Sequence, residues 1–212
     1  MLHNIREEYR SPNLEISDLD PNPFHQFHDW FQEVLKADIG DPNAMTLSTC
    51  TPDGRPSARI VLLKGYDENG FVFYTNYESR KGQEMSANAH VALNFLWKKL
   101  YRQIRIEGQA AKMTAEESTT YFQSRPRGSQ VGAWASPQSG VISDKAILEK
   151  RVKEVQERFK GQETLPLPPF WGGYRVVPSV IEFWQGQPSR LHDRFFYEKK
   201  ENGGWGISRL AP

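Results

Sequence analysis

A series of short apolar segments, separated by turn signals, constrains the fold of this sequence more than any other feature. Residues 44–50, 57–64, 71–76, 90–97 and 101–112 each have the length and composition of a β-strand, and we expect 57–64 to be buried. Asn69-Gly70 separates two of these segments and is a strong hairpin signal. Further strands are predicted at residues 173–184, 193–199 and 205–210. Seven or eight strands without regular βαβ units predict a mainly β (α+β) fold, an antiparallel β-barrel with peripheral helices.

Helices are predicted around this barrel. Asn22-Pro23 is a typical helix start, and apolar residues at helical spacing predict a helix over residues 23–37. Shorter helices are expected at 79–87 and, after a capping box at Thr114, up to about residue 124. A longer helix is expected from Ser143 to about residue 160. We divide the chain into an N-terminal arm or lid, 1–20, and a single domain, 21–212.

The composition excludes several classes of protein. A net charge of +1 gives no electrostatic basis for binding nucleic acid or an anionic membrane. Cys50 is the only cysteine, so no disulfide forms within the chain. The five histidines show no metal-ligand spacing, no segment has the apolar length of a membrane span, and no signal-peptide core begins the chain. We therefore expect a cytoplasmic protein without a metal site.

Residues 183–195 combine charged and aromatic side chains in an unusual way. Arg190, His192 and Arg194 alternate, so an extended backbone would place all three on one face. Two guanidinium groups beside an imidazole would suit an anionic or electron-rich planar ligand. The alternative is a solvated edge strand with surface charges.

Two other groups of residues are suited to binding phosphate. Ser79-Arg80-Lys81 opens a helix directly after a strand, and Arg59 and Lys64 bound an apolar strand. A second group, Tyr121, Arg125 and Ser129, surrounds the end of a helix. Gln103 and Gln138-Ser139 offer amide and hydroxyl partners for a heteroaromatic ring. Each feature alone also fits a solvated helix start or a structural polar residue. Together they indicate two phosphorylated ligands, or one ligand with two anionic ends.

The ordered set of motifs resembles the pyridoxine (pyridoxamine) 5'-phosphate oxidase family from about Arg6 to Pro212. The matching segments are Arg59-Ile-Val-Leu-Leu-Lys64, Phe73-Tyr-Thr-Asn76, Ser79-Arg-Lys81, Ser124-Arg-Pro126, Phe170-Trp-Gly-Gly173, Phe183-Trp-Gln-Gly186, Arg190-Leu-His-Asp-Arg194 and Arg209-Leu-Ala-Pro212. The resemblance implies an FMN-binding split β-barrel and a homodimer with FMN between the subunits. It also implies that about 170–212 form the dimerisation and active-site segment.

The resemblance assigns roles to residues of this chain. It implies cofactor contacts for Arg59, Ile60, Val61, Leu62, Tyr74, Thr75, Arg80, Lys81, Gln103, Gln138, Ser139, Trp184 and Arg194. It implies substrate contacts for Arg6, Tyr9, Lys64, Tyr121, Arg125, Ser129, Arg190, Leu191 and His192. Arg190 and His192 would be the catalytic pair. Asp41 is a further candidate near the site, or a turn residue before Pro42.

The implied reaction oxidises pyridoxine 5'-phosphate or pyridoxamine 5'-phosphate to pyridoxal 5'-phosphate. The cofactor would take a hydride from the substrate, and molecular oxygen would be the final acceptor and yield hydrogen peroxide. Two alternatives keep the fold: a vitamer- or flavin-binding protein without turnover, and a split-barrel flavoenzyme acting on another reductant. The Arg190/His192 pair argues against the first, and the group around Arg125 argues against the second.

Overall fold

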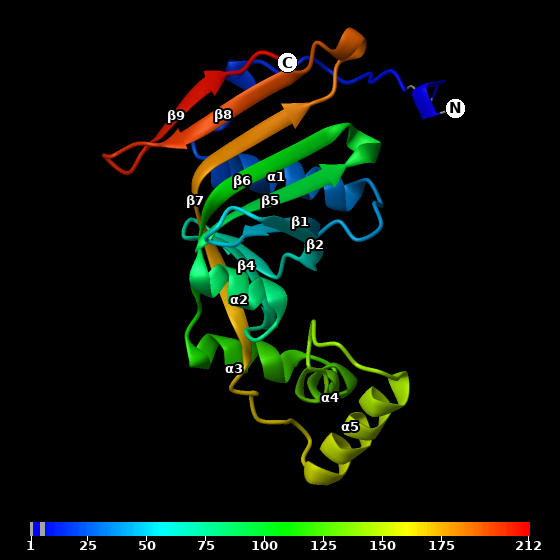
Figure 1. Cartoon of the computed structure of the whole chain (residues 1–212). Helices are drawn as coiled ribbons and strands as arrows, with labels where there is room; N and C mark the ends of the chain where they lie inside the picture. Colours follow the sequence, from blue (N-terminus) through cyan, green and yellow to red (C-terminus); the bar gives the residue numbers. More distant parts are fainter. Residues whose placement is uncertain (1, 5–6) are drawn as a thin grey trace.

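A single curved antiparallel sheet organises the chain. The computed structural model describes residues 2–4 and 7–212, and in this described part nine strands form the sheet, which curls into a half-barrel (Figure 1). The strands are β1 (Ala44–Cys50), β2 (Pro56–Leu62), β3 (Gly65–Asp67), β4 (Gly70–Asn76), β5 (His90–Trp97), β6 (Arg102–Lys112), β7 (Trp171–Gln185), β8 (Asp193–Lys199) and β9 (Trp205–Arg209). Their order is β2-β1-β5-β6-β7-β4-β3, and β8 and β9 continue from β7. The predicted mainly β, split-barrel fold class is confirmed.

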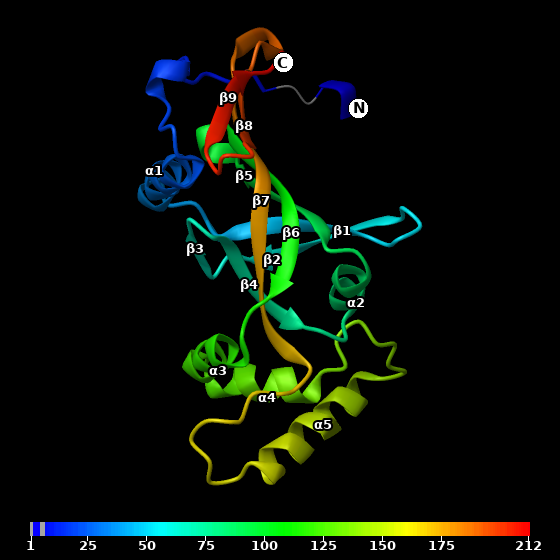
Figure 2. The same cartoon turned by 90° about the vertical axis from the view of Figure 1, so that its left-hand side faces the viewer.

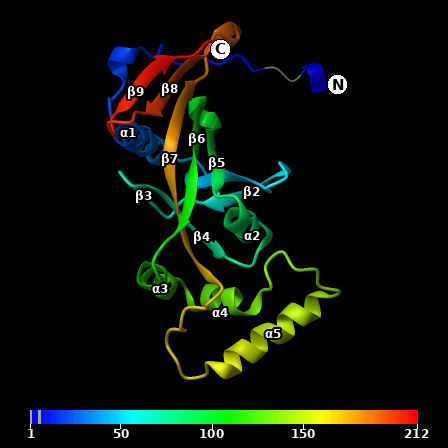
Figure 3. The ribbon, with the colours of Figure 1, turned by 60° about the vertical axis from the view of Figure 1, so that its left-hand side comes forward.

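Strand β7 is the longest strand and links the two ends of the molecule (Figures 2 and 3). Its first half pairs with β4 and its second half with β8, while β6 follows it along most of its length. A bulge opposite Glu107 and Gly108 leaves Ser179 as an extra residue beside Pro178. Proline has no N–H to donate to the ladder, so a bulge is a position where a strand tolerates it.

Helix α1 (Pro23–Lys36) covers the main core. The side chain of Asn22 caps it by accepting a hydrogen bond from the Phe24 N–H at 2.9 Å, as the Asn-Pro signal predicted. Phe27 and Val34 are fully buried on its inner face, against the sheet. Burying an apolar side chain of this size stabilises a fold by about 1.5–3 kcal/mol, so this helix anchors the barrel.

A second, smaller core lies at the other end of β7. It gathers Phe122, Val131, Phe159 and Leu165 around Trp171. The helices that form it are α3 (Ala115–Ser124), α4 (Arg127–Ala135) and α5 (Lys145–Arg158), and α2 (Arg80–Ala87) lies between this core and the sheet (Figure 1). The remaining elements are short 3-10 turns, η1 (Leu2–Asn4), η2 (Ile16–Asp18), η3 (Lys98–Leu100) and η4 (Pro188–Arg190). In the described part of the chain, every helix is too short or too polar to cross a lipid bilayer.

Several local predictions differ from the structure. Helix α4 was not predicted, because Pro126 and two glycines obscure its apolar periodicity. Strand β3 is too short, at three residues, to produce a detectable pattern. Helix α5 is capped by Asp144 rather than Ser143. Asp41 lies in a turn with φ 48°, and its carbonyl accepts from the Ala44 N–H, which agrees with the turn interpretation.

The prediction that 57–64 is a buried strand is wrong for the single chain. Strand β2 alternates between exposed and half-buried residues, with Ile60 65% and Leu62 40% exposed. Its apolar residues suggested burial, but β2 is the last strand in the sheet order and has a neighbour on one side only. An edge strand with exposed apolar side chains is a typical surface for a partner or a ligand.

The predicted common face of Arg190, His192 and Arg194 is also wrong. Pro188–Arg190 form the turn η4, and the strand begins only at Asp193. Ser189 and Arg190 both have positive φ, 55° and 64°, so the backbone reverses direction here. Alternation of side chains requires an extended backbone, and Pro188 begins a turn instead.

Candidate functional site

The first group of candidate residues lies where β4 leads into α2. The Ser79 hydroxyl caps α2 by accepting from the Gly82 N–H, and the helix starts directly after the strand. A Cβ atom on Gly82 would lie 2.2 Å from the Tyr77 carbonyl oxygen, so this tight approach requires glycine. The turn therefore places Arg80 and Lys81 in the first turn of a helix, where the helix dipole favours an anion.

Lys81 lies in this group without a carboxylate partner among the described residues. Its Nζ donates to Gln138 Oε1 at 2.8 Å and to the hydroxyls of Thr75 and Ser79 at 3.2 Å. Burial, together with the positive charge of Arg59, lowers the pKa of Lys81 to about 8. An ammonium group held by neutral acceptors is suited to pairing with a bound anion.

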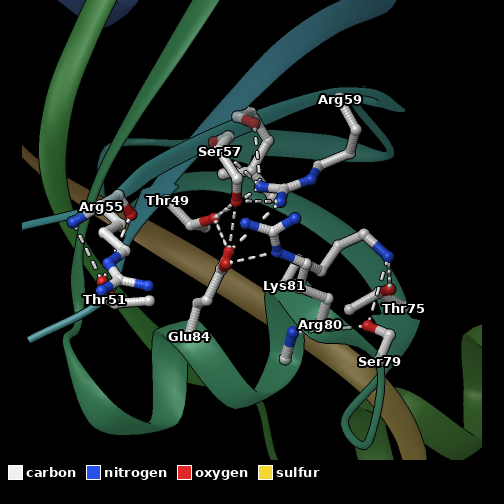
Figure 4. Close-up of polar contacts among 12 residues, drawn as sticks. Thr49, Thr51, Arg55, Ser57, Arg59, Thr75, Ser79, Arg80, Lys81 and Glu84 are labelled. Atoms are coloured by element: carbon white, nitrogen blue, oxygen red, sulfur yellow. Dashed lines mark hydrogen bonds and ion pairs between the residues drawn. The ribbon is translucent and has the colours of Figure 1, made fainter. Parts of the chain in front are cut away.

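A carboxylate that the sequence analysis did not single out, Glu84, organises the arginines beside it. Its oxygens accept from Ser57 Oγ at 2.6 Å, Arg80 Nε at 2.8 Å and Arg59 Nη2 at 3.3 Å (Figure 4). From the sequence alone, Glu84 looks like an ordinary glutamate on a helix surface. Nothing in the sequence indicates that it is buried, because its burial depends on how α2 packs against β1. Arg59 also donates to the Leu47 carbonyl at 3.2 Å.

Tyr121 and Arg125 of the second group line the same cavity as Arg59 and Lys81, whereas Arg80 lines a separate cavity of about 570 Å³. The shared cavity, of about 390 Å³, is lined by Arg59, Ile60, Val61, Leu62, Lys64, Tyr74, Thr75, Lys81, Tyr121, Arg125, Gln138 and Trp171. An adjoining cavity of about 250 Å³ includes Ser129 with Arg125 and Gln138. The structure therefore brings together predicted cofactor residues and predicted substrate residues around one hollow.

Aromatic stacking and an unpaired cation characterise this second group. Tyr121 stacks on Tyr74 with ring centroids 3.8 Å apart, and the Arg125 guanidinium lies 4.7 Å from the centroid of Trp171. Arg125 Nη1 is buried and has no hydrogen-bond partner within the described residues. Burial lowers the pKa of Arg125. A buried guanidinium N–H without a partner is costly, and an anionic ligand would satisfy it.

The third group lies at the far end of β7. Arg190, His192 and Trp184 line a cavity of about 650 Å³, together with Tyr9 from the N-terminal segment. Tyr9 packs edge-on against Trp184, with centroids 5.8 Å apart. His192 Nδ1 accepts a hydrogen bond from the Gln187 N–H at 3.0 Å, and burial with two nearby arginines lowers its pKa.

Other predicted residues lie at the edges of these groups. Gln103 pairs with Trp184 across β6 and β7 and lines a neighbouring cavity of about 470 Å³. Arg194 donates to Glu182 Oε1 at 2.8 Å and to the Ala211 carbonyl at 2.8 Å. Ser139, with φ 70°, lines a cavity of about 570 Å³.

Leu191 is exposed next to the third group, 69% accessible. Arg6 lies outside the described residues.

Within one chain, the first two groups and the third do not meet. Trp171 begins β7 beside the first cavity, and Trp184 lies near its other end beside the third group. A strand of 15 residues spans roughly 45 Å when extended. Figure 2 shows β7 running from the end near α3 and α4 to the end where β8 pairs with it. One chain therefore carries two separate groups of candidate residues.

Comparison with known proteins decides the family. The model of the family described as pyridoxamine 5'-phosphate oxidase matches residues 31–159, and that of the pyridoxine 5'-phosphate oxidase C-terminal dimerisation region matches 171–212. The chain belongs to the pyridoxamine 5'-phosphate oxidase family. This confirms the identification from the motifs, and with it the assignment to a family of oxidoreductases.

Relatives of high identity carry the family name. Pyridoxine/pyridoxamine 5'-phosphate oxidase of Burkholderia thailandensis is 57% identical over all of this chain and 99% of its own length. That of Paraburkholderia phymatum is 56% identical with the same coverage.

Solved structures extend the comparison. One similar structure is PhzG from Burkholderia lata 383, solved in complex with tetrahydrophenazine-1-carboxylic acid. The match covers 97% of this chain and 100% of PhzG, with a TM-score of 0.89 and 30% sequence identity. A pyridoxamine 5'-phosphate oxidase-related, FMN binding protein from Nostoc punctiforme shares the fold, at TM-score 0.69 and 15% identity over 92% of this chain and all of that one.

Several residues at these cavities were not identified as candidates from the sequence. Asn76, Trp171 and Gln187 line the cavities as well, and none of the three was singled out from the sequence. Trp171 lies within a motif that matches the family and Gln187 lies between two such motifs, but nothing in the sequence separates either of them from core residues. Asn76 is buried and accepts from the Glu78 N–H, so its role in the strand-to-helix turn was not visible from the sequence.

Proposed function

We propose that this protein oxidises pyridoxine 5'-phosphate or pyridoxamine 5'-phosphate to pyridoxal 5'-phosphate, with FMN as cofactor and molecular oxygen as final acceptor. Bound FMN would supply the two-electron redox chemistry for this conversion, in which a hydride leaves the 4'-carbon of the substrate and oxygen, as final acceptor, becomes hydrogen peroxide. The names of the relatives of 56–57% identity support this substrate class.

The observation that carries the proposal is the presence of two cationic groups around one cavity. Arg59 and Lys81 lie on it with Lys64 and Arg125. Each pair suits one phosphoryl group, because phosphate recognition depends on charge-assisted hydrogen bonds. Two phosphorylated molecules, a cofactor and a substrate, would account for both pairs.

The first cationic group fits the phosphate of FMN. The N-terminal turn of α2 offers a positive helix end, Arg80 and Lys81 offer charge, and the Thr75 hydroxyl lies beside Lys81 at 3.2 Å. The exposed apolar side chains of Ile60 and Leu62, on the same cavity, would contact the flat, largely apolar part of the cofactor.

The second cationic group would hold the substrate phosphate. Arg125 Nη1 lacks a partner among the described residues, and Lys64 and Tyr121 lie on the same cavity. This grip is remote from the carbon that reacts, so its binding energy serves to orient the ring.

A homodimer would complete the site. Arg190 and His192 are roughly one strand length away from this cavity in their own chain, so we propose that a second copy supplies them. The family model matched by residues 171–212 is described as a dimerisation region, and these residues include both side chains. The exposed apolar residues of β2 provide a surface that a second copy would cover.

His192 would act as a hydrogen-bond donor to the substrate. Its Nδ1 is occupied by the Gln187 N–H, so the proton of the neutral ring lies on Nε2. Its lowered pKa keeps the ring neutral at physiological pH. Arg190, exposed and held on a left-handed backbone, would place a positive charge over the substrate ring.

The test uses the purified full-length protein. We expect a yellow protein with flavin absorption, which anaerobic pyridoxine 5'-phosphate bleaches and air restores with formation of peroxide. Bound flavin without bleaching would indicate a carrier instead of an oxidase. Bleaching by other reductants but not by either B6 phosphate would indicate a different split-barrel flavoenzyme. A cytoplasmic location belongs to the same proposal, and cell fractionation tests it.

A further inference from the structure

The carboxylate of Glu84 is the buried acidic group nearest to the first cationic group, and the proposed reaction does not use it. Its side chain is 6% exposed. Burial alone would raise its pKa, but hydrogen bonds from the surrounding hydroxyl and guanidinium groups lower the pKa to about 2. Glu84 is therefore ionised throughout the physiological range, and a buried charge of this kind requires a reason.

The two carboxylate oxygens of Glu84 make different contacts. Oε2 accepts from Thr49 Oγ1 at 2.5 Å and Ser57 Oγ at 2.6 Å, and it lies 3.3 Å from Arg59 Nη2. Oε1 accepts from Arg80 Nε at 2.8 Å. The strand hydroxyls thus fix the carboxylate, and its other oxygen is left for Arg80 (Figure 4).

Arg80 differs from Arg59 and Lys81 because its terminal N–H donors are not used in hydrogen bonds to the described residues of the protein. Arg59 uses Nη1 on the Leu47 carbonyl and Thr49, and Nη2 on Ser57 and Glu84. All three Lys81 contacts go to protein oxygens. Within the described residues, the terminal nitrogens of Arg80 have no protein partner, and its side chain is 63% exposed.

We propose that Glu84 is a positioning residue for phosphate recognition, holding Arg80 through Nε so that both terminal nitrogens face the phosphoryl group of the cofactor. An arginine fork binds two phosphate oxygens at once when its plane is fixed. A free, exposed arginine would lose rotamer entropy on binding, and the contact with Glu84 removes much of that cost beforehand. The inference rests on the proposed function for the identity of the anion.

The experiment compares the affinities of the apoprotein for FMN and for riboflavin, which lacks the phosphate, by quenching of flavin fluorescence. Glu84→Gln is expected to weaken FMN binding ~10-fold, which is the effect typical of losing one charge-assisted hydrogen bond. Riboflavin binding should change by less than ~2-fold, because riboflavin has no phosphate. Glu149→Gln is the matched control, because Glu149 pairs with Lys145 at i,i+4 on α5, outside the site. It should bind both flavins like the wild type.

A double-mutant cycle separates positioning from a general structural role. If Glu84 acts through Arg80, Glu84→Gln added to Arg80→Ala should weaken FMN binding by less than a further ~2-fold. Arg80→Lys keeps the charge but has no Nε to bind Glu84, so it should lose about as much FMN affinity as Arg80→Ala. Because Arg80 is exposed, Arg80→Lys keeps the test available even if Glu84→Gln does not fold.

Several outcomes would overturn the inference. One is that Glu84→Gln loses FMN affinity and riboflavin affinity equally. Another is that the effects of Glu84→Gln and Arg80→Ala multiply independently in the double variant. A third is that Arg80→Lys binds FMN with wild-type affinity. If the wild type binds FMN and Glu84→Gln binds it equally well, only this inference fails. If the wild type does not bind FMN, the proposed function fails and the inference fails with it.

Discussion

At the scale of single residues, the site depends on cations whose pairing is incomplete. Lys81 and Arg125 are both partly buried, and neither has a carboxylate partner among the described residues. Burial lowers the pKa of each. Such groups destabilise the empty site and strengthen binding of an anion, because the anion restores the interactions that burial removed.

The pH dependence of FMN binding should follow Lys81. The pKa of Lys81 is lowered to about 8, so in the free protein its ammonium group loses a proton as the pH rises above 8. A bound phosphate dianion would keep this ammonium group protonated. We expect FMN affinity to fall between pH 8 and 10, by at most about tenfold per unit, and riboflavin affinity to stay constant. Fluorescence titrations across this range measure both. Parallel pH profiles for the two flavins would contradict a role of Lys81 at the phosphate.

Arg125 should contribute to substrate binding and little to the chemical step. Arg125→Ala is expected to weaken binding of pyridoxal 5'-phosphate by about 1.5–3 kcal/mol, the range for hydrogen bonds to charged groups. Equilibrium titration of the flavin spectrum with this ligand measures the loss. Unchanged affinity would show that the buried guanidinium serves only to pack against Trp171.

The two catalytic candidates should behave differently. Arg190→Ala is expected to slow anaerobic flavin reduction ~10²-fold, as loss of a group that positions the substrate does. His192→Asn should cause a smaller loss and leave the pH profile of the rate unchanged from pH 7 upward, because the pKa of His192 is already lowered and its Nδ1 is occupied. Stopped-flow reduction at several pH values tests both variants. An ionisation in the wild type that His192→Asn abolishes would instead assign a proton-transfer role.

At the scale of elements, the sequence predicted the regular segments well and the irregular ones poorly. The hairpin at Asn69-Gly70, the cap at Asn22 and the capping box at Thr114 all appear in the structure, because each is determined by neighbouring residues. Helix α4 and turn η4 were missed, because Gly128 and Pro188 weaken the local patterns and tertiary contacts determine the outcome.

The candidate site shows the same division. Motifs identified the cationic residues, and the structure places many of them on one cavity. The exposure of β2 and the burial of Glu84 could not be predicted, since both depend on which strand lies at the sheet edge and how α2 packs. Alternation along 190–194 failed as a guide, because it assumes an extended backbone.

The bulge in β7 should be sensitive to a single methyl group. A Cβ atom on Gly108 would lie 2.2 Å from the Val177 carbonyl oxygen, so Gly108→Ala should destabilise the fold by more than ~2 kcal/mol. Gly128 in α4 has open space around its Cβ position, and Gly128→Ala should stabilise by about 0.5–1 kcal/mol. Urea denaturation of the apoproteins compares the two. Equal stability of both variants would show that the sheet relaxes around Gly108.

At the scale of the whole molecule, the length of β7 separates the two proposed half-sites. The strand carries Trp171 at the cavity lined by Lys64 and Arg125, and Trp184 at the cavity lined by Arg190. In a symmetric dimer, the same two half-sites on each copy can form two complete sites, because each copy offers one half to the other. In the proposed dimer, the chemistry would therefore require both copies.

Subunit complementation tests this arrangement most directly. Two variants, Lys64→Ala/Arg125→Ala and Arg190→Ala, damage different proposed half-sites. At low substrate concentration each homodimer should be nearly inactive, because the first binds substrate weakly and the second reduces flavin slowly. After the two are unfolded together and refolded with FMN, random pairing should produce hybrid dimers with one intact site. Activity should then recover to about a quarter of the wild-type value, because half of the dimers are hybrids with one of two sites intact. Hybrid dimers that form but stay as inactive as the parents would contradict a site shared between two copies.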